Sequence, residues 1–395
     1  MPKLDYRVVD ADHHYYEAAD AFTRYLDPKL ARRNFQWTEL NGRPTLIICG
    51  KVSHFIPNPT FDPVAKPGSL DNFFRGHNPE GLNIREAFGE LEPISPTYRD
   101  RDARLAQMDE QGVEACWMFP TLAVGVEEAT KHDAAITHAA LHAFNEWIFD
   151  DWGFAYQNRI FGTPLISLMD IDKAVAEVEW VLERGARILH LRSAPVPGPK
   201  RHSIADPIYD PFWARVNEAR ATVAFHACET GYGEYAAHWG EPEMVEAFNY
   251  SPYTQVTQSD RAIVDSLAAL VVHGVFDRFP QVRAASIENG SFWVHGFLKN
   301  LAKAERMNVG SFKQPPLENF RRHVAIAPFY EEDVIHLAGA IGAENILMGS
   351  DFPHAEGLAE PWTFVKELEK FSDAEQRAIM RDNTLRLLDP AGAPD

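Results

Sequence analysis

Short apolar runs recur along the chain, and most of them follow a helix-like stretch that ends in Gly or Pro. Such runs lie at residues 7–12, 113–120, 159–168, 186–192, 221–229, 282–288, 323–329 and 345–351. A continuously apolar run is typical of a parallel strand that is buried on both faces, and a preceding glycine is typical of a helix C-cap. Eight strands that alternate with helices predict an α/β fold of the (β/α)8 TIM-barrel type, formed by the whole chain as one domain. A doubly wound sheet is the alternative, but eight units favour closure.

Two stretches interrupt this alternation. Residues 32–96, after the first strand, are too long for an ordinary loop, and Asn41-Gly42 within them predicts a β-hairpin. Residues 230–259, after the fifth strand, are rich in aromatic side chains, among them Tyr232, Tyr235 and Trp239. Loops that follow barrel strands lie over the C-terminal mouth, where active sites occur. We therefore expect these insertions to form a lid and substrate wall, a subunit interface, or both.

Composition narrows the classes of protein that the chain can represent. It has 395 residues and a formal net charge of −19, and such an acidic surface repels nucleic-acid phosphates. No apolar run approaches the roughly 20 residues that span a bilayer. The first residues enter a strand-like segment directly, and the three cysteines are spaced neither as a disulfide framework nor as a zinc ribbon. We expect a cytoplasmic protein with no nucleic-acid or membrane partner, and a capping box at Ser372–Glu375 predicts a last helix over about 373–388.

Polar residues gather at the C-terminal ends of the predicted strands. They end the first, fourth, fifth, sixth and eighth strands, as Asp10-Ala-Asp12-His13-His14, His190-Leu-Arg192, His226-Ala-Cys228-Glu229, Glu288-Asn289 and Asp351-Phe-Pro-His354. Asp12 and His14 are two residues apart, so an extended strand points both side chains to one side. A single histidine in a strand is usually a core residue, but five polar strand ends at one mouth would each need a buried partner. A shared divalent metal ion supplies that partner.

These motifs resemble those of the amidohydrolase superfamily, and in particular the amidohydrolase family 2 branch related to aminocarboxymuconate-semialdehyde decarboxylase. Asp12-x-His14, His226 and Gly349-Ser-Asp351-Phe-Pro-His354 are the principal matches. Supporting matches are the segments 111–121 (from Gln-Gly-Val to Phe-Pro-Thr), 274–280 and 382–383, so the resemblance runs from Val9 to Leu388. The resemblance implies a metal-dependent TIM barrel. Members include decarboxylases, C–C and C–N hydrolases and metal-dependent oxygenases, so the fold alone does not select a reaction.

The resemblance implies the metal ligands Asp12, His14, His226 and Asp351. Asp12 stands where many relatives have histidine, and this harder oxygen donor shifts the preference from zinc toward manganese or iron. One ion is favoured over two. The remaining acidic and imidazole groups are candidates for a second ion or for partners of the ligating histidines: Glu17, Glu229, Glu288 and His354.

One departure concerns acid–base chemistry. Decarboxylase-type relatives carry a catalytic histidine on the sixth strand, where this chain has Asn289 after Glu288. Asparagine can orient or polarise an oxygen, but it cannot shuttle a proton at neutral pH. His273 and His354 are the candidates to replace that histidine, although His273 precedes the strand, where it could simply cap a helix.

The leading hypothesis is a metal-dependent hydrolase of a small, aromatic or apolar, acid-bearing substrate. Asp351 would take the proton of a metal-activated water that attacks a carbonyl carbon. Arg192 would hold a substrate carboxylate, or else pair with a carboxylate of the mouth, and Trp239, Tyr232 and Tyr235 would form the substrate wall. The alternatives are a non-oxidative decarboxylase, an iron or mixed-metal oxygenase, and a non-catalytic partner subunit of an active paralogue. A homodimer is the expected assembly, with a hetero-oligomer as the alternative.

Overall fold

The computed structural model describes residues 4–198, 202–243 and 246–389. Its core strands form two sheets in which every neighbouring pair is parallel. The first has the order β1-β7-β8 and the second the order β13-β12-β11-β10-β9. The strands are β1 (Val8–Tyr15), β7 (Val113–Pro120), β8 (Ile160–Gly162), β9 (Leu165–Ile166), β10 (Ile188–Leu191), β11 (Thr222–His226), β12 (Arg283–Ile287) and β13 (Val324–Ile326). The prediction of an α/β fold with buried parallel strands is confirmed.

Backbone hydrogen bonds connect the two sheets at both edges. Residues 346–352 lie between β13 and β1, because Leu347 N donates to Ile326 O (2.9 Å) and Ala11 N donates to Met348 O (2.9 Å). At the other edge, β8 and β9 belong to one run that is interrupted at Pro164, whose carbonyl accepts from His190 N (2.8 Å). The prediction of a regular strand at 345–351 was wrong. Only Ile346 and Phe352 form bridges, and Asp351 has a positive φ of 56°, which is incompatible with an extended ladder.

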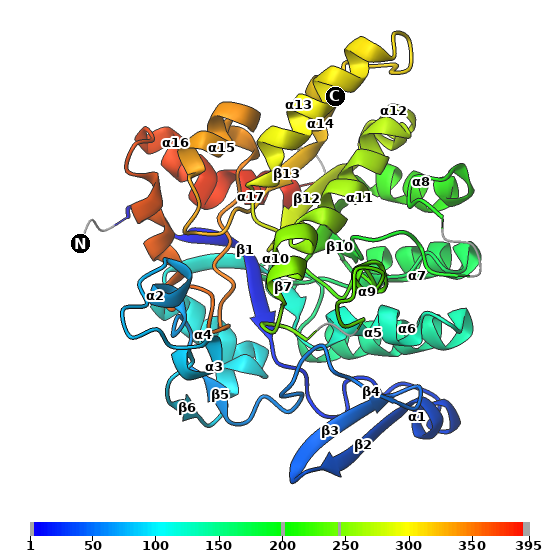
Figure 1. Cartoon of the computed structure of the whole chain (residues 1–395), viewed down its shortest axis with the longest axis vertical. Helices are drawn as coiled ribbons and strands as arrows, with labels where there is room; N and C mark the ends of the chain where they lie inside the picture. Colours follow the sequence, from blue (N-terminus) through cyan, green and yellow to red (C-terminus); the bar gives the residue numbers. More distant parts are fainter. Residues whose placement is uncertain (1–3, 199–201, 244–245, 390–395) are drawn as a thin grey trace.

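Helices lie around the strands (Figure 1). The longer ones are α4 (Arg101–Glu110), α6 (Ala134–Asp151), α7 (Ile171–Glu183), α8 (Asp210–Ala219), α11 (Arg261–Val272), α13 (Trp293–Met307), α14 (Pro316–His323) and α15 (Val334–Ile341). The shorter ones are α1 (Pro28–Asn34), α2 (Asp71–Phe74), α3 (Ile84–Ala87), α5 (Val126–Thr130), α9 (Gly233–Ala237), α10 (Pro252–Gln258) and α12 (Val275–Arg278). Gly112 and Gly185 end α4 and α7 at φ 69° and 92°, so the chain turns directly into the next strand. Within the described ranges, no helix has the length and apolarity that a membrane crossing requires.

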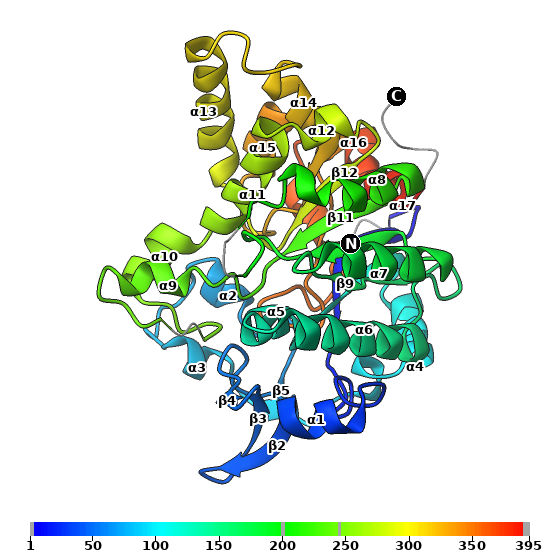
Figure 2. The same ribbon diagram turned by 90° about the vertical axis from the view of Figure 1, so that its right-hand side faces the viewer.

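The 32–96 segment contains the predicted hairpin, which projects from one end of the molecule in Figure 2. Strands β2 (Phe35–Leu40) and β3 (Arg43–Ile48) pair in antiparallel fashion across Asn41-Gly42, whose φ values are 53° and 74°. Two positive φ values match a type I′ turn. The segment also contains β4 (Lys51–Val52), β5 (Val64–Ala65) and β6 (Leu91–Glu92).

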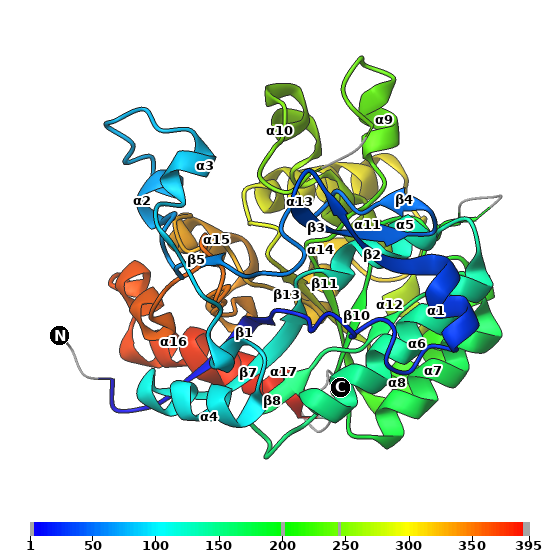
Figure 3. The same ribbon diagram turned by 90° about the horizontal axis from the view of Figure 1, so that it is seen from below.

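The two interrupting segments contact each other. Ala247 N donates to Phe55 O (2.8 Å), and the rings of Phe88 and Phe248 lie 5.9 Å apart. Helices α2 and α3 lie at the same end of the molecule as α9 and α10 (Figure 3). The 32–96 segment also reaches residues after Asp351, because Leu70 N donates to Ala355 O (2.9 Å).

The chain ends in helical turns that support the 346–352 segment. The Ser372–Glu375 capping box is present and opens α16 (Asp373–Arg377). A π-helical turn over 378–382 leads into α17 (Asn383–Leu388), so the predicted last helix is interrupted in its middle. Asn383 Nδ2 donates to Ala343 O (2.9 Å) and Ile346 O (2.8 Å), which anchors the start of that segment.

Candidate metal centre and active site

The four predicted ligands converge at the ends of β1, β11 and the 346–352 segment. His14 Nε2 lies 3.3 Å from Asp12 Oδ1, 3.3 Å from Asp351 Oδ1 and 3.2 Å from His226 Nε2. His226 Nε2 lies 3.4 Å from Asp12 Oδ1. The other ring nitrogen of His226 donates to Ala227 O (2.8 Å), so Nε2 is the nitrogen that faces the cluster. Strand alternation explains why Asp12 and His14 share one side, while His13 points to the other.

These residues fit a divalent metal ion. Ligand atoms about 2.1 Å from one ion are separated by roughly 3.0–3.4 Å in octahedral or tetrahedral geometry, which matches the measured separations. Asp12 is 3% exposed, and its Oδ1 has no hydrogen-bond donor among the described residues. A buried carboxylate without a donor needs a cation. Asp12, His14, His226 and Asp351 are therefore suited to hold the ion.

Charge and burial strongly perturb this cluster. Burial, followed by the neighbouring His354 and His226, lowers the pKa of His14 well below its usual value, so its ring is neutral and free to coordinate. Burial, together with Glu288 and Asp12, raises the pKa of Asp351 well above its usual value. Burial opposes a charge on His226, but Glu288 and Asp12 outweigh it and raise that pKa. A metal cation would reduce the electrostatic repulsion among the carboxylates of Asp12, Glu288 and Asp351.

A buried polar network lies beneath the ligands. Asp10 Oδ1 accepts from Asp12 N (3.0 Å) and from Ser350 N (3.0 Å), so it ties together the backbones that carry Asp12 and Asp351. Its Oδ2 lies 3.0 Å from His13 Nε2, and Arg104 donates to His14 O (2.9 Å) from the far side. Sequence reasoning placed Asp10 at the strand end but assigned it no role, because its partner Ser350 N is 340 residues away and leaves no local signal.

A second group shares Asp351 with the first. It consists of Glu288, Asp351, His354 and Glu356, whose candidate ligand atoms lie within 4.8 Å of one another. Sequence reasoning named Glu288 and His354 but missed Glu356, for which burial and then Asp351 raise the pKa to about 8. Glu288 has φ 56°, a strained conformation that accompanies a 3.0 Å contact between its Oε2 and His226 Nε2.

The hydrogen-bond pattern around His354 places a proton between Asp351 and His354. Thr121 Oγ1 donates its only proton to Tyr15 O (2.9 Å), so it must accept from His354 Nε2 (2.9 Å). His354 Nδ1 lies 2.6 Å from Asp351 Oδ1, and this contact needs a further proton between the two atoms. His354 is thus oriented by Thr121 and linked to Asp351. His273 instead ends α11 and bonds Ser203 Oγ (3.2 Å).

Two predicted acidic residues lie outside these groups. Glu17 Oε1 accepts from the backbone N–H groups of Thr121, Leu122 and Ala123 at 2.8–3.1 Å, so it supports the turn after β7. Glu229 Oε1 accepts from Gly231 N (2.8 Å). Neither belongs to a potential metal-ligating group of the described residues.

Asn289 is occupied by backbone contacts. Its Nδ2 donates to Phe225 O (2.8 Å) and Ile287 O (2.7 Å), which links the ends of β11 and β12. This geometry does not support the catalytic role predicted for Asn289, because its side-chain amide already donates to two backbone carbonyls and holds the two strand ends together.

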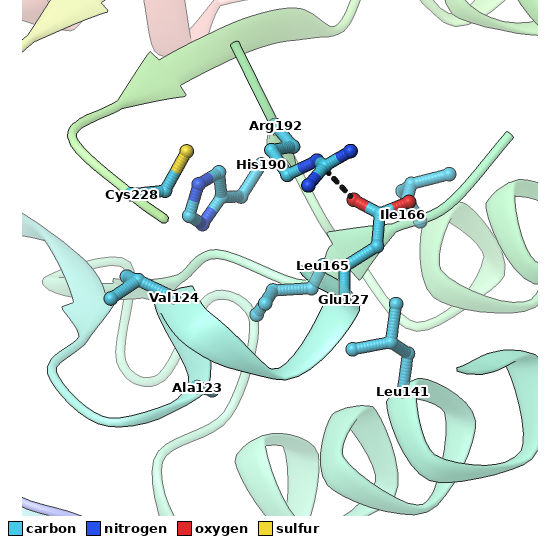
Figure 4. A pocket seen from close by; sticks show the side chains of 9 residues that line it. All are labelled: Ala123, Val124, Glu127, Leu141, Leu165, Ile166, His190, Arg192 and Cys228. Carbon is cyan, nitrogen blue, oxygen red and sulfur yellow. Dashed lines mark ion pairs between the residues drawn. The ribbon is translucent and has the colours of Figure 1, made fainter. Parts of the chain in front are cut away.

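Arg192 pairs with protein carboxylates. Its Nε lies 3.3 Å from Glu127 Oε2, its Nη1 donates to Glu128 Oε2 (2.6 Å), and its Nη2 donates to Pro195 O (3.3 Å). This arrangement matches the ion-pair alternative, but with carboxylates of α5 that sequence reasoning did not consider. Figure 4 shows the guanidinium against Glu127 beside a cavity of about 20 Å³, which holds about one water molecule rather than a substrate.

The aromatic residues of 230–259 differ in placement. Trp239 and Tyr235 are 63% and 56% exposed, and the Tyr232 hydroxyl donates to Asp265 Oδ2 (3.1 Å). Such exposure suits a subunit interface as well as a substrate wall, and both remain predictions. Tyr250 is 45% exposed as a residue, and desolvation of its hydroxyl, together with the charges of Glu229, Glu288 and Glu356, raises its pKa to about 12.

Comparisons with known proteins agree with this geometry. The family model described as amidohydrolase matches residues 9–389. The solved structure of an amidohydrolase from Mycobacterium avium subsp. paratuberculosis K-10 is 48% identical, covers 98% of this chain and 100% of its own, and has a TM-score of 0.93.

Two decarboxylase structures share the fold at low sequence identity. A dihydroxybenzoic acid decarboxylase from Polaromonas sp. JS666, with bound manganese and an inhibitor, is 17% identical over 85% of this chain and 95% of its own, with a TM-score of 0.58. The 5-carboxyvanillate decarboxylase from Sphingomonas paucimobilis is 15% identical over 97% and 98%, with a TM-score of 0.56. The predicted resemblance is confirmed, and the chain belongs to the amidohydrolase family, in the branch that its family 2 model describes.

Proposed function

We propose that this protein is a metal-dependent hydrolase whose ion is held by Asp12, His14, His226 and Asp351. The observation that carries the proposal is that the ligand atoms of Asp12, His226 and Asp351 all lie 3.2–3.3 Å from the fourth, His14 Nε2. When bound, such an ion polarises a substrate carbonyl and makes water more acidic. One ion is proposed, either manganese, iron or zinc, with Glu288, His354 and Glu356 as the groups that a second ion would use.

The chain supplies the proton transfers. The Asp351 carboxylate accepts the proton of the attacking water, and its Oδ1 is linked to His354 Nδ1, 2.6 Å away, through the proton that this pair already holds. Thr121 holds the imidazole in this orientation. His354 thereby fills the acid–base role that Asn289 cannot serve.

We also infer that the parallel segments close into one (β/α)8 barrel, with both interrupting segments over its C-terminal mouth. Support comes from the hydrogen bonds that join residues 346–352 to β13 on one side and to β1 on the other. The barrel brings β1, β11 and residue 351 around one mouth, as the ligand cluster requires.

Decarboxylation of an aromatic acid is the second candidate, and the decarboxylases of similar fold favour it. Two features of the site oppose it, namely Asn289 in place of the expected histidine and an Arg192 that is already paired. The second group of potential ligands, Glu288, Asp351, His354 and Glu356, could hold a second ion, which keeps the iron or mixed-metal oxygenase as a further alternative. The convergence of the predicted ligands opposes a non-catalytic subunit.

Product analysis of the reconstituted enzyme distinguishes these reactions. With zinc-, manganese- or iron-loaded protein, a panel of amides, lactones and aromatic acids is incubated in H2¹⁸O. Hydrolysis incorporates one ¹⁸O into the product acid, decarboxylation releases CO2 and adds solvent hydrogen to carbon, and oxygenation consumes dioxygen. We expect ¹⁸O incorporation that Asp351→Asn abolishes without unfolding. Release of CO2 without incorporation of water oxygen would replace hydrolysis with the second candidate.

A further inference from the structure

Arg104, on α4, is a fully buried cation that contacts the backbone of the candidate metal centre. Its side chain donates from Nε to Thr97 O (2.7 Å) and from Nη2 to His14 O (2.9 Å). Its hydrogen-bond partners among the described residues are two backbone carbonyls, a ring nitrogen and a thioether sulfur, none of which is an anion. A buried charge without a direct counter-charge costs free energy that a neutral side chain would avoid. Core packing alone therefore does not explain an arginine at this position.

The backbone of the predicted ligand His14 is held from both sides. Its N–H donates to Phe352 O (2.8 Å), and its carbonyl accepts from Arg104. Phe352 directly follows the ligand Asp351, and the centre of its ring lies 5.2 Å from the guanidinium carbon and 5.4 Å from the centre of the His13 ring. Arg104 therefore contacts both of the backbone segments that carry these two ligands.

His13 connects Arg104 to a buried carboxylate. Arg104 Nη1 lies 3.4 Å from His13 Nδ1, and because a guanidinium can only donate, this ring nitrogen must accept. The proton of the His13 ring is therefore on Nε2, which lies 3.0 Å from Asp10 Oδ2. The other carboxylate oxygen of Asp10 accepts from Asp12 N and Ser350 N, at 3.0 Å each. A chain of contacts thus runs from the buried cation through His13 to the carboxylate that joins the two ligand-bearing segments.

We propose that Arg104 is a positioning residue of the metal centre. It sets the spacing of the ligand atoms along two routes, directly through the carbonyl of His14 and indirectly, by way of His13, through the Asp10 carboxylate. Arginine suits this role because its planar fork of N–H donors holds several acceptors in fixed directions. The role rests on the proposed function, which assigns the metal ligands. Since its bonds are to the protein, Arg104 acts on the affinity and geometry of the bound ion.

Variants of Arg104 and His13 test this role. Competition with a chelator measures the affinity for manganese, and the visible absorption of the cobalt-loaded protein at saturation reports the geometry of the ion. We expect Arg104→Met to bind manganese about 10- to 100-fold more weakly and to change the cobalt spectrum. His13→Phe keeps a ring but interrupts the contacts with Asp10, so we expect about a tenfold loss. His13→Gln, whose amide can still donate to Asp10, should retain most of the affinity.

Arg283→Met is the matched control. Arg283 is also buried, at 3% exposure, and it also donates to backbone carbonyls, those of Arg220, Arg386 and Asp389. It is the first residue of β12, at the end of the strand opposite to the ligands. Its replacement should destabilise the fold comparably to Arg104→Met but leave the manganese affinity and the cobalt spectrum unchanged. General loss of stability is thereby separated from loss of ligand positioning.

Hydrogen exchange of the chelated proteins tests the same role without the ion. Arg104→Met and His13→Phe should raise the exchange of backbone amides in residues 8–15 and 346–352, and Arg283→Met should not. Wild type that binds no divalent ion would contradict the proposed function, whereas hydrogen exchange would still decide whether Arg104 holds these segments.

Three results would overturn the positioning role. They are wild-type manganese affinity in Arg104→Met and His13→Phe, an equal loss of affinity in Arg283→Met, and unchanged exchange in both segments. If Arg104→Met does not fold, His13→Phe and its rescue by His13→Gln decide the outcome, since both retain the buried arginine.

Discussion

Glu17→Gln tests the physical account of the turn after β7. Glu17 is 1% exposed, and its Oε1 accepts three backbone N–H groups, while Oε2 is buried without a partner. Burial raises the pKa of Glu17 to about 7, although the three backbone hydrogen bonds work in the opposite direction. Glutamine keeps the accepting oxygen and removes the charge, so the substitution isolates the free-energy cost of ionising this buried group.

The sign and size of the effect follow from linkage. A carboxyl pKa that is higher in the folded than in the unfolded chain stabilises the fold at low pH, and this stabilisation is lost as pH rises from about 4.5 to 7. The full cost above pH 7 is about 3 kcal/mol, of which about 2 kcal/mol appears between pH 5.5 and 8. The melting temperature of the variant should therefore gain about 2–3 °C on the wild type over that interval, given typical unfolding entropies for a chain of this length.

Scanning calorimetry at fixed scan rate measures this difference. Wild type and Glu17→Gln are compared at pH 5.5, 6.5, 7.5 and 8, with all samples chelated so that metal binding does not contribute. A constant offset from the new amide group cancels in the pH dependence. Glu39→Gln, exposed on β2, controls for general charge removal. A difference that stays flat with pH, or that favours the variant more at pH 5.5, would refute the burial argument.

Three further predictions concern the site and its supports. Asp10→Ala should lower metal affinity about 10- to 100-fold in a chelator competition assay, whereas Asp10→Asn, whose carbonyl still accepts from Asp12 N and Ser350 N, should retain most of it. Arg192→Met should destabilise the protein by about 3–5 kcal/mol in urea unfolding, because it leaves the buried Glu127 carboxylate without a cation, whereas the half-buried Glu128 still pairs with Lys131, and adding Glu127→Gln should recover much of that loss. Chelation should lower the melting temperature of the metal-loaded wild type, and restored manganese should return it; unchanged melting would contradict the metal site.

Several features were predictable because their causes are local. The hairpin at Asn41-Gly42 follows from two residues that readily adopt positive φ. The placement of Asp12 and His14 on one side follows from strand alternation, and the gathering of polar residues at one edge follows from the parallel direction of the strands. The ligand set itself came from the resemblance, and the structure brings Asp12, His226 and Asp351 each within 3.3 Å of His14 Nε2.

Other features depend on contacts between distant parts of the chain. Arg192 meets Glu128 from a position 64 residues away, and a charged residue in a sequence does not reveal which opposite charge it will meet. Glu356 lies two residues after His354 of the strand-end motif, but only the fold brings its carboxylate close to Glu288, Asp351 and His354. Asp10 resembles an ordinary strand residue until its bond to Ser350 is seen.

The irregular path of residues 346–352 explains why an apolar run here is not a strand. A Cβ on Gly349 would lie 2.9 Å from Asp12 Cβ, so glycine is needed where Asp12 crosses toward the site. Asp351 then takes φ 56°, while its backbone N–H donates to Asp12 O (2.8 Å). This turn gives up the regular ladder and places Asp351 beside His14 and His354. Strained backbone persists only where the surrounding contacts hold it, and it is common at functional sites. We therefore expect a departure from regular strand geometry at the point where the ligands meet.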